Sequence, residues 1–338
     1  MAEPRSATTD VEQSVDVESR DRGARSRPNG RRAPESPTGL RTRSWFGVLG
    51  RTVRAFSADN LTDWAAALTY YGILAIFPAL IVLVSVLGLI GSSATKPLID
   101  NLGTVAPGPA KQIFTSAITN LQKSQGAAGV LFVAGLLGAL WSASGYVAAF
   151  MRASNAIYDV PEGRPIWTTA PVRIGVTLVL VVLLSVSAVA VVFTGGLAKQ
   201  AGNVLGVGQS AIDAWDIAKW PVLLIVISLM FAILYWAAPN VRQPGFRWIS
   251  PGGLVAVVVW IVASAAFAFY VANFGSYNKT YGALGGIIIF LVWLWISNIA
   301  VLLGAEFNAE LERGRQIESG MPPDREPFLE PRDTRKFD

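Results

Sequence analysis

The sequence predicts an all-α, polytopic membrane protein: a bundle of six transmembrane helices preceded by an interfacial amphipathic helix. Six stretches of 22 to 32 residues contain no Asp, Glu, Lys or Arg, although the chain carries 28 basic and 23 acidic residues. Overall, 52% of the 338 residues are hydrophobic and only 15% are charged. Soluble amphipathic helices carry charge along one face, whereas a hydrocarbon core of about 30 Å needs about 20 consecutive apolar residues. Lipid is therefore the expected solvent for the charge-free stretches.

Each charge-free stretch predicts one membrane-spanning helix, because each is long enough to cross the bilayer once. The expected helices cover residues 66–91, 127–150, 174–197, 219–239, 250–273 and 284–305. Six helices that are apolar all round cannot all be central in a soluble protein of this size. They define one membrane domain over residues 41–312, with a tail on either side.

The segment before the first crossing predicts an amphipathic helix at the membrane surface. Apolar side chains recur there at helical spacing, at Trp45, Leu49, Val53 and Phe56. At 100° per residue, Arg43, Arg51 and Arg54 fall on the opposite side. Such a helix lies in the inner headgroup region with its arginines toward anionic lipid, or it packs against the cytoplasmic ends of the bundle. The sequence leaves both arrangements open.

Both tails are expected to be disordered and cytoplasmic. Residues 1–40 have few large apolar side chains, and residues 313–338 are similarly polar, so neither buries enough surface to offset the entropy of ordering. Residues 1–63 hold eleven basic and nine acidic side chains. A nearly balanced tail of this kind binds phosphate poorly, so no nucleic-acid partner is expected.

The distribution of basic residues predicts the orientation. With the N-terminus inside, the inner segments near the helices hold twelve Arg, and the outer segments hold six Lys. Basic residues accumulate on the cytoplasmic side of membrane proteins. Because the number of crossings is even, both termini are expected in the cytoplasm.

The chain contains neither Cys nor His. Their absence excludes disulfides, thiolate nucleophiles, zinc–thiolate sites and iron–sulfur ligation, and it removes the most frequent general base. Carboxylate, Lys, Tyr or Ser chemistry would remain, but no acidic residues cluster within the membrane domain. We therefore expect no catalytic residues, no metal site and no cofactor, and we do not expect an enzyme.

Polar residues inside the charge-free stretches are the candidates for function, because polar groups in a bilayer are costly unless they are paired. The first helix holds Tyr70 and Tyr71, and Pro78 is expected to kink it. The sixth helix carries Asn298 in its interior and Glu306 at its inner end. These residues are expected to line a cavity between the first, fifth and sixth helices, on a path for substrate.

Residues 273–282, between the last two helices, form the most unusual segment. It combines two Gly, two Tyr, two Asn and one charge between two apolar helices. It forms an external hairpin or dips back into the bilayer, since irregular backbone is tolerated at depth where protein or a water-filled cavity satisfies it. Its candidate substrate contacts are Asn273, Tyr277, Asn278, Lys279 and Tyr281.

Three polar residues continue the second helix at its cytoplasmic end. Arg152, Asn155 and Asp159 are three and four residues apart. This spacing lets one helical face carry an ion pair and a hydrogen bond. Structural bracing is their expected role.

Five short motifs are spread over residues 45–312. They are Ala67-Leu-Thr-Tyr-Tyr-Gly-Ile-Leu-Ala-Ile-Phe-Pro78, Asn155-Ala-Ile-Tyr158, Arg164-Pro-Ile-Trp167, Tyr281-Gly-Ala-Leu-Gly285 with Trp293, and Gly304-Ala-Glu-Phe-Asn308. In this order they resemble the YihY/BrkB family of bacterial inner-membrane proteins. The resemblance implies a six-helix protein of the plasma membrane, associated with virulence or serum resistance in some members.

Some members of that family carry the label ribonuclease BN. The enzyme of that name uses a zinc site built largely from His, and this sequence contains no His. A two-magnesium site would need carboxylates clustered on one surface, and the membrane domain offers no such cluster in its sequence. We therefore expect no ribonuclease activity.

The leading hypothesis is a permease or a transporter that handles lipids or solutes, with membrane lipids and an unidentified solute or lipid as its partners. The alternative is a membrane scaffold for envelope assembly, or a virulence-associated factor, in which the tails recruit partners and the polar groups only join helices. An oligomer is compatible with either. A transporter, unlike a scaffold, needs a cavity with polar groups within the membrane.

Overall fold

The computed structural model describes residues 42–90, 128–192, 208–243, 245–246, 250–273 and 283–337. Within these ranges the chain is helical and forms no β-strand. The helices, in order, are α2 (Thr42–Ala58), α3 (Leu61–Ile90), α6 (Ala128–Ile157), α7 (Ile166–Val192), α9 (Gln209–Ala237), α10 (Pro251–Asn273) and α12 (Ala283–Glu318). The predicted all-α fold is confirmed. The expected disordered tail at 1–40 lies outside the described residues.

Five of these helices, α6, α7, α9, α10 and α12, are long and apolar enough to cross a membrane, judged by length and composition. They confirm a multi-pass membrane architecture. The further helix α3 has 30 residues, and its crossing, which would bring the number to six, stays a prediction.

The helices extend beyond the charge-free stretches that predict them. α6 ends at Ile157 instead of 150, α9 begins at Gln209 instead of 219, and α12 ends at Glu318 instead of 305. The expected ends mark where charge first appears in the sequence. A helix continues into water as long as its backbone hydrogen bonds and its packing are kept, so the edge of the lipid and the end of the helix differ.

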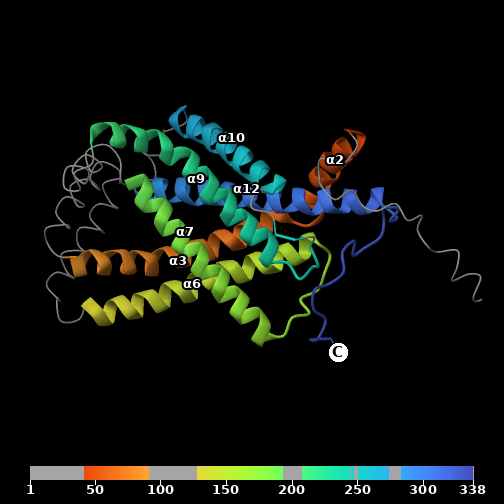
Figure 1. The fold of residues 1–338 in the computed structure, drawn as a ribbon, viewed down its shortest axis with the longest axis horizontal. Helices are drawn as coiled ribbons and strands as arrows, with labels where there is room; N and C mark the ends of the chain where they lie inside the picture. Colours follow the sequence, from red (N-terminus) through yellow and green to blue (C-terminus); the bar gives the residue numbers. More distant parts are fainter. Residues whose placement is uncertain are drawn as a thin grey trace, which may run out of the picture.

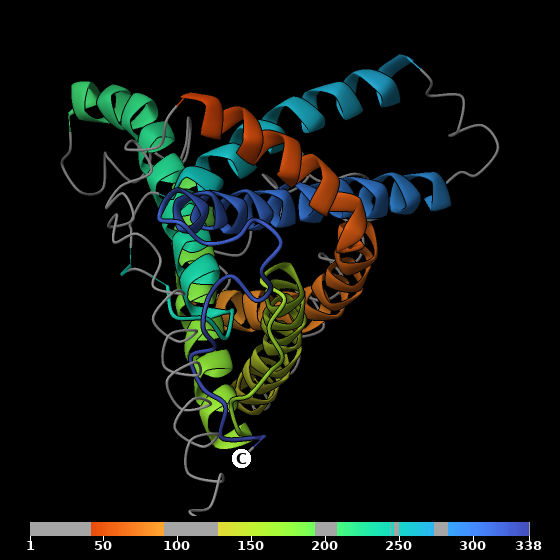
Figure 2. The ribbon, with the colours of Figure 1, turned by 90° about the vertical axis from the view of Figure 1, so that its right-hand side faces the viewer.

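The helices associate as two close pairs linked by α12. α3 lies beside α6, and α10 lies beside α12 (Figures 1 and 2). α12 also contacts α3 and α2, and α7 contacts α6 and α9. The contact of α6 with α3 is far more extensive than its contact with α7. α6 therefore has one closely packed neighbour and one loosely packed neighbour.

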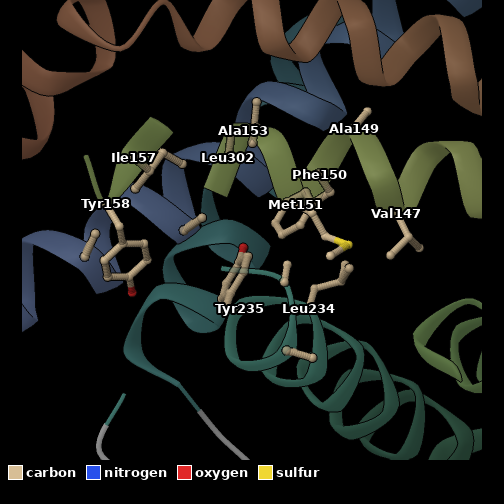
Figure 3. Close-up of a cluster of buried hydrophobic side chains, with 14 of the residues drawn as sticks. Val147, Ala149, Phe150, Met151, Ala153, Ile157, Tyr158, Leu234, Tyr235 and Leu302 are labelled. Atoms are coloured by element: carbon tan, nitrogen blue, oxygen red, sulfur yellow. The ribbon is translucent and has the colours of Figure 1, made fainter. Parts of the chain in front are cut away.

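The core lies where α6, α9 and α12 meet. Phe150 of α6 is fully buried and stacks on Tyr235 of α9, with the ring centroids 6.1 Å apart (Figure 3). The Tyr235 hydroxyl donates a hydrogen bond of 2.7 Å to the Val301 carbonyl of α12, and the neighbouring Leu302 is fully buried. Close packing and hydrogen bonds of this kind hold helices together in lipid. The C-terminal half of α6 is thereby fixed in position.

The amphipathic helix α2 packs against the bundle by one face only. Val48 and Thr52 are buried, and Val48 packs against Phe307 and Leu311 of α12. Phe46, Leu49 and Val53 remain exposed, at 74%, 50% and 72%. The helix thus docks on the bundle, and Arg51 pairs with Glu310 of α12. Its placement in the headgroup region, with the exposed apolar face toward lipid, stays a prediction.

The segment after α12 packs against the bundle, in contrast to the disordered tail predicted for 313–338. Backbone hydrogen bonds of 2.9 Å join the Arg332 N–H to the Asn240 carbonyl and the Lys336 N–H to the Gly163 carbonyl. Two apolar side chains of the segment are buried, Phe328 and Leu329. Composition alone does not reveal this order, because the order comes from docking onto the α6–α7 and α9–α10 connections rather than from a core within the segment.

Candidate functional site

A cleft of about 600 Å³ lies between α6 and α7, and a second cavity of about 330 Å³ continues from it toward α3. Side chains of α6 form one wall of the cleft and side chains of α7 form the other. The exposed fraction of Trp141 is 77%, so the cleft opens to the surface there. Four residues line both cavities: Trp141, Ala148, Arg152 and Arg173.

Helical spacing explains how the walls are built. On α6, Trp141, Ala148 and Arg152 are seven and four residues apart, which puts them on one helical face. On α7, Ile166, Arg173 and Thr177 have the same spacing. The chain reverses between Ile157 and Ile166. Arg152 lies near the end of α6 that meets this reversal, whereas Arg173 reaches Trp141 and Ser144, eight or more residues earlier on α6.

The cleft combines its two cations with apolar side chains. Leu137 and Leu140 of α6 line it, and Ile166 and Ile174 line it from α7. Leu140 precedes Arg152 by twelve residues, which corresponds to about 18 Å along a helix. Arg173 stacks on Trp141, next to Leu140, so it lies beside the apolar lining of α6, and Arg152 lies toward the other end.

Aromatic rings hold both arginines in place. The guanidinium carbon of Arg173 lies 5.8 Å from the Trp141 ring centroid, and that of Arg152 lies 5.9 Å from the Tyr71 ring centroid. Arg173 also donates a hydrogen bond of 2.6 Å to Ser144 Oγ, and the Ser144 hydroxyl donates to the Trp141 carbonyl at 2.7 Å. A guanidinium stacked on a ring keeps N–H donors at its edge available for a ligand.

Neither of these guanidinium groups pairs with a carboxylate in the parts of the chain that the structure describes. Glu162 lines the same cleft, but its carboxylate binds Arg164 at 2.7 Å and accepts a hydrogen bond of 2.9 Å from Asn155. Burial by itself would raise the pKa of Glu162, but the hydrogen bonds and the charge of Arg164 outweigh burial and lower it. Glu162 stays ionised and paired, and the cleft keeps an excess of positive charge.

The sequence profile of the virulence factor BrkB family matches residues 52–328. This chain belongs to the BrkB family. Among its relatives, the ribonuclease-like protein YfkH of Bacillus subtilis is 32% identical over 264 residues, which are 78% of this chain and 93% of YfkH. A UPF0761 membrane protein of Alkalilimnicola ehrlichii is 31% identical over 276 residues, 76% of this chain and 56% of that protein. The UPF0761 membrane protein azo3165 of Azoarcus sp. is 30% identical over 290 residues, 82% of this chain and 66% of that protein.

Membership of the BrkB family confirms the resemblance that the sequence motifs indicate. The chain spans nearly all of YfkH but less than two thirds of either UPF0761 protein. No solved structure matches this chain. The term ribonuclease-like belongs to the name of YfkH. In the described ranges of this BrkB protein, no group of three or more acidic side chains is placed to hold a metal ion.

The structure brings Tyr71, one of the residues predicted to line a cavity, into the smaller cavity of this BrkB protein beside Arg152. Tyr70 packs edge-on against Tyr71, with ring centroids 5.4 Å apart, and is 60% exposed. Asn273 ends α10, where its side-chain amide donates a hydrogen bond of 2.8 Å to the Phe269 carbonyl. None of the three described cavities is lined by Tyr70 or Asn273.

Other predicted residues lie where the structure gives no side chains. Pro78 falls within α3, but its side chain is outside the described set. Residues 274–282 lie outside the described ranges, and with them the choice between a hairpin and a re-entrant segment. They include four of the predicted contacts: Tyr277, Asn278, Lys279 and Tyr281.

Asn298 of α12 joins three helices instead of bordering a described cavity. Its side-chain amide donates a hydrogen bond of 3.0 Å to Thr69 Oγ1 of α3, and its carbonyl oxygen accepts one of 2.9 Å from the Tyr146 hydroxyl of α6. The exposed fraction of Asn298 is 3%. A buried amide with both ends bonded stabilises helix association in lipid.

Glu306 is almost fully buried, with an exposed fraction of 1%, and its carboxyl group meets Asp59 of the α2–α3 turn. Its Oε2 atom has no hydrogen-bond partner among the described residues. One turn farther along α12, Glu310 pairs with Arg51 of α2. These polar contacts fasten the α2–α3 turn to α12, away from the α6–α7 cleft.

The residues predicted to brace the second helix have different surroundings. Asn155 is buried, donates to Glu162 and accepts a hydrogen bond of 2.7 Å from the Asn240 N–H, which ties α6 to two connections. Asp159 follows the end of α6 in the left-handed region, with φ of 53°. Arg152 lines the cleft.

Sequence reasoning missed Trp141 and Arg173 as site residues. Arg173 directly precedes a charge-free stretch and Trp141 lies within one. Both features are typical of residues that anchor a helix at the membrane interface, so neither predicts a binding site. The available signal was the shared spacing of seven and four residues on α6 and α7. Only the packing of α6 against α7 shows that these two faces meet.

Proposed function

We propose that this BrkB protein is a transporter of lipid-like substrates in the plasma membrane, with both termini in the cytoplasm and the α6–α7 cleft as its binding site. The observation that carries the proposal is the cleft itself, which offers about 600 Å³ between two membrane helices. Its apolar side chains, among them Leu137 and Leu140, suit an acyl chain, and its two cations, Arg152 and Arg173, suit a headgroup.

The packing of α6 supports this proposal. α6 is held firmly by α3 and by the core around Phe150, while its contact with α7 is less extensive. A loosely packed helix beside a cleft is a wall that can move without disrupting the core. The protein binds and moves its substrate without chemical change, so no catalytic group or cofactor takes part.

A proteoliposome assay tests the proposal. Vesicles that contain a fluorescent phospholipid are treated with a membrane-impermeant quencher, and the fraction of label that reaches the outer leaflet is followed with time. We expect the wild-type protein to increase this fraction. Ala148→Trp fills the space shared by both cavities and should abolish the increase, whereas Ala134→Trp, on an exposed part of the same helix, should not.

Unchanged flux in Ala148→Trp would show that the cleft is not the path. Loss of flux in Glu306→Gln or Lys279→Ala, with unchanged flux in Ala148→Trp, would indicate a substrate path along the last two helices, α10 and α12. Absence of flux in the wild type for every lipid and solute tested would favour a non-transporting role.

A membrane scaffold is the second candidate function, and one observation favours it. Asn155, Arg164 and Asn240 form a buried network that joins the α6–α7 connection, the α9–α10 connection and the C-terminal segment. Such a network makes this face rigid, which suits the binding of a partner. In that case Ala148→Trp would leave the cellular function intact, while disruption of the network would not.

A further inference from the structure

We infer that the α6–α7 cleft selects an anionic phospholipid, with the phosphate bound by Arg152 and Arg173 and the acyl chains along the apolar lining. The inference rests on the proposed function, because it names the ligand class of the same site. Four features carry it: the two cations, the way they are held, the pairing of the nearby acid, and the apolar lining of the cleft.

The two arginines are suited to a phosphate. Guanidinium groups bind phosphate oxygens through paired N–H donors, and such charge-assisted hydrogen bonds are stronger than neutral ones. Arg173 is already held by Ser144 and by the Trp141 ring, so little side-chain freedom is lost when a ligand binds. Arg152 is exposed over the Tyr71 ring, where an incoming headgroup can reach it.

The charge balance of the cleft favours an anionic headgroup over a zwitterionic one. Glu162, the acidic residue that lines the cleft, is engaged by Arg164, which is itself almost fully buried. A headgroup ammonium would therefore meet two guanidinium groups without a carboxylate to receive it. A headgroup that carries only the phosphate charge avoids this repulsion.

The apolar part of the lining favours a lipid over free phosphate. Leu137 and Leu140 of α6 and Ile166 and Ile174 of α7 line the same cleft of about 600 Å³ as the two arginines. A ligand whose charge sits at the arginines therefore meets apolar side chains that suit an acyl chain. Inorganic phosphate would contact the arginines and leave these apolar side chains without a ligand.

Ligand-induced stabilisation of the purified full-length protein in detergent tests the inference. Dioctanoyl phosphatidylglycerol, dioctanoyl phosphatidylcholine and inorganic phosphate are titrated separately, and the unfolding temperature is recorded at each concentration. We expect phosphatidylglycerol to raise the unfolding temperature at concentrations at least about tenfold below those needed for phosphatidylcholine. Inorganic phosphate should produce no comparable shift.

Variants assign the effect to the arginines. Arg152→Gln and Arg173→Gln should each weaken the binding of phosphatidylglycerol about tenfold, as expected for one charge-assisted hydrogen bond. Arg173→Lys keeps the charge without the planar donor pair and should fall between wild type and Arg173→Gln. Arg242→Gln removes an equal charge from an exposed ion pair with Glu330, outside the cleft, and should bind as wild type does.

Several results would overturn the inference. Equal affinity for the two lipids would remove the selectivity, and stabilisation by inorganic phosphate equal to that by phosphatidylglycerol would indicate an anion site without a lipid. Wild-type affinity in Arg152→Gln would exclude a phosphate bound by both arginines, and this outcome does not depend on the folding of Arg173→Gln, since Arg152 is exposed. Selective lipid binding without flux would support the inference and contradict the transport function. Flux without a preference for phosphatidylglycerol would support the transport function and contradict the inference.

Discussion

Gly252 of α10 and Gly304 of α12 meet backbone to backbone, so closely that a Cβ atom on either would overlap the carbonyl oxygen of the other. The Gly252 N–H also donates a hydrogen bond of 2.8 Å to Asn308 Oδ1, one turn along α12. Helices approach to this distance only where small residues face each other. This contact fixes the position of α10 on α12.

Gly304→Ala should therefore lower the stability of the protein. The added methyl group has no space beside α10, and overpacking of this kind costs about 1–3 kcal/mol. Gly286→Ala is the matched control, because it lies on the same helix with nothing within 4 Å of the added atom. The measurement is the unfolding temperature in detergent. Equal unfolding temperatures for the two variants would contradict the close contact.

The hydrogen bonds of Asn298 predict an energetic coupling between α12 and α6. Asn298→Leu removes the acceptor for Tyr146 and the donor to Thr69. In a double-mutant cycle with Tyr146→Phe, we expect a coupling free energy of about 0.6 kcal/mol, the average for side-chain hydrogen bonds within membranes. Stability is measured by unfolding in a denaturing detergent. Strict additivity of the two substitutions would show that the bond contributes nothing.

Asp59 predicts a pH dependence of stability. Burial raises the pKa of Asp59 from 3.8 to about 6, despite the opposing hydrogen bond from Glu306. The folded protein therefore holds this proton more tightly than the unfolded chain does. The stabilising contribution is complete below pH 3.8 and is lost as the pH rises through 6. The expected loss is roughly 1–2 kcal/mol after allowance for solvent screening.

Comparison with Asp59→Asn isolates this contribution, because the variant resembles the protonated side chain at every pH. The free energy of unfolding of the variant, relative to wild type, should increase between pH 4 and pH 6 and then stay level. A difference that does not change with pH would exclude a raised pKa at Asp59.

The C-terminal segment should detach when Asn240 is replaced. The Asn240 side chain donates hydrogen bonds to the Asp333 and Pro161 carbonyls, at 2.8 and 3.2 Å, and all three residues meet at the α6–α7 connection. Asn240→Ala removes both hydrogen bonds, each of which contributes about 0.5–1.5 kcal/mol to stability. Hydrogen exchange at the Arg332 and Lys336 amides should become faster. Arg242→Gln, which breaks only an exposed ion pair, should leave both amides protected.

Many elements of the fold could be predicted from the sequence, because a charge-free stretch is a local property. Its length alone decides whether a helix can cross the hydrocarbon core. The charge-free stretch from Trp248 to Asn278 predicts a helix over 250–273, and α10 covers Pro251–Asn273. α12 is different, because its last thirteen residues, after Ala305, are rich in charged side chains and stay helical through contacts with α2 and the C-terminal segment. No local pattern reports such contacts.

The candidate site was less predictable for a related reason. Asn298 and Glu306 stand out in the sequence as polar groups in or beside an apolar helix, yet the partners that bury them, Thr69 and Asp59, come from more than 200 residues earlier. Arg152 and Arg173 look like ordinary anchors at helix ends. Whether an anchor faces lipid, a neighbouring helix or a cleft depends on the rotation of its helix in the bundle, which spacing alone does not give.

The sequence by itself determined that lipid surrounds much of this chain and that its helices are long. The reason is that the charge-free stretches contain enough consecutive apolar residues to cross a bilayer. It also determined that chemistry based on Cys or His is absent. Only the tertiary structure decided that α6 packs tightly on α3 and loosely on α7. It also decided that Arg152 and Arg173, which pair with no carboxylate among the described residues, line the resulting cleft. The physical reason is that a cavity belongs to no single segment, because it is the space left where the faces of two helices fail to fill each other.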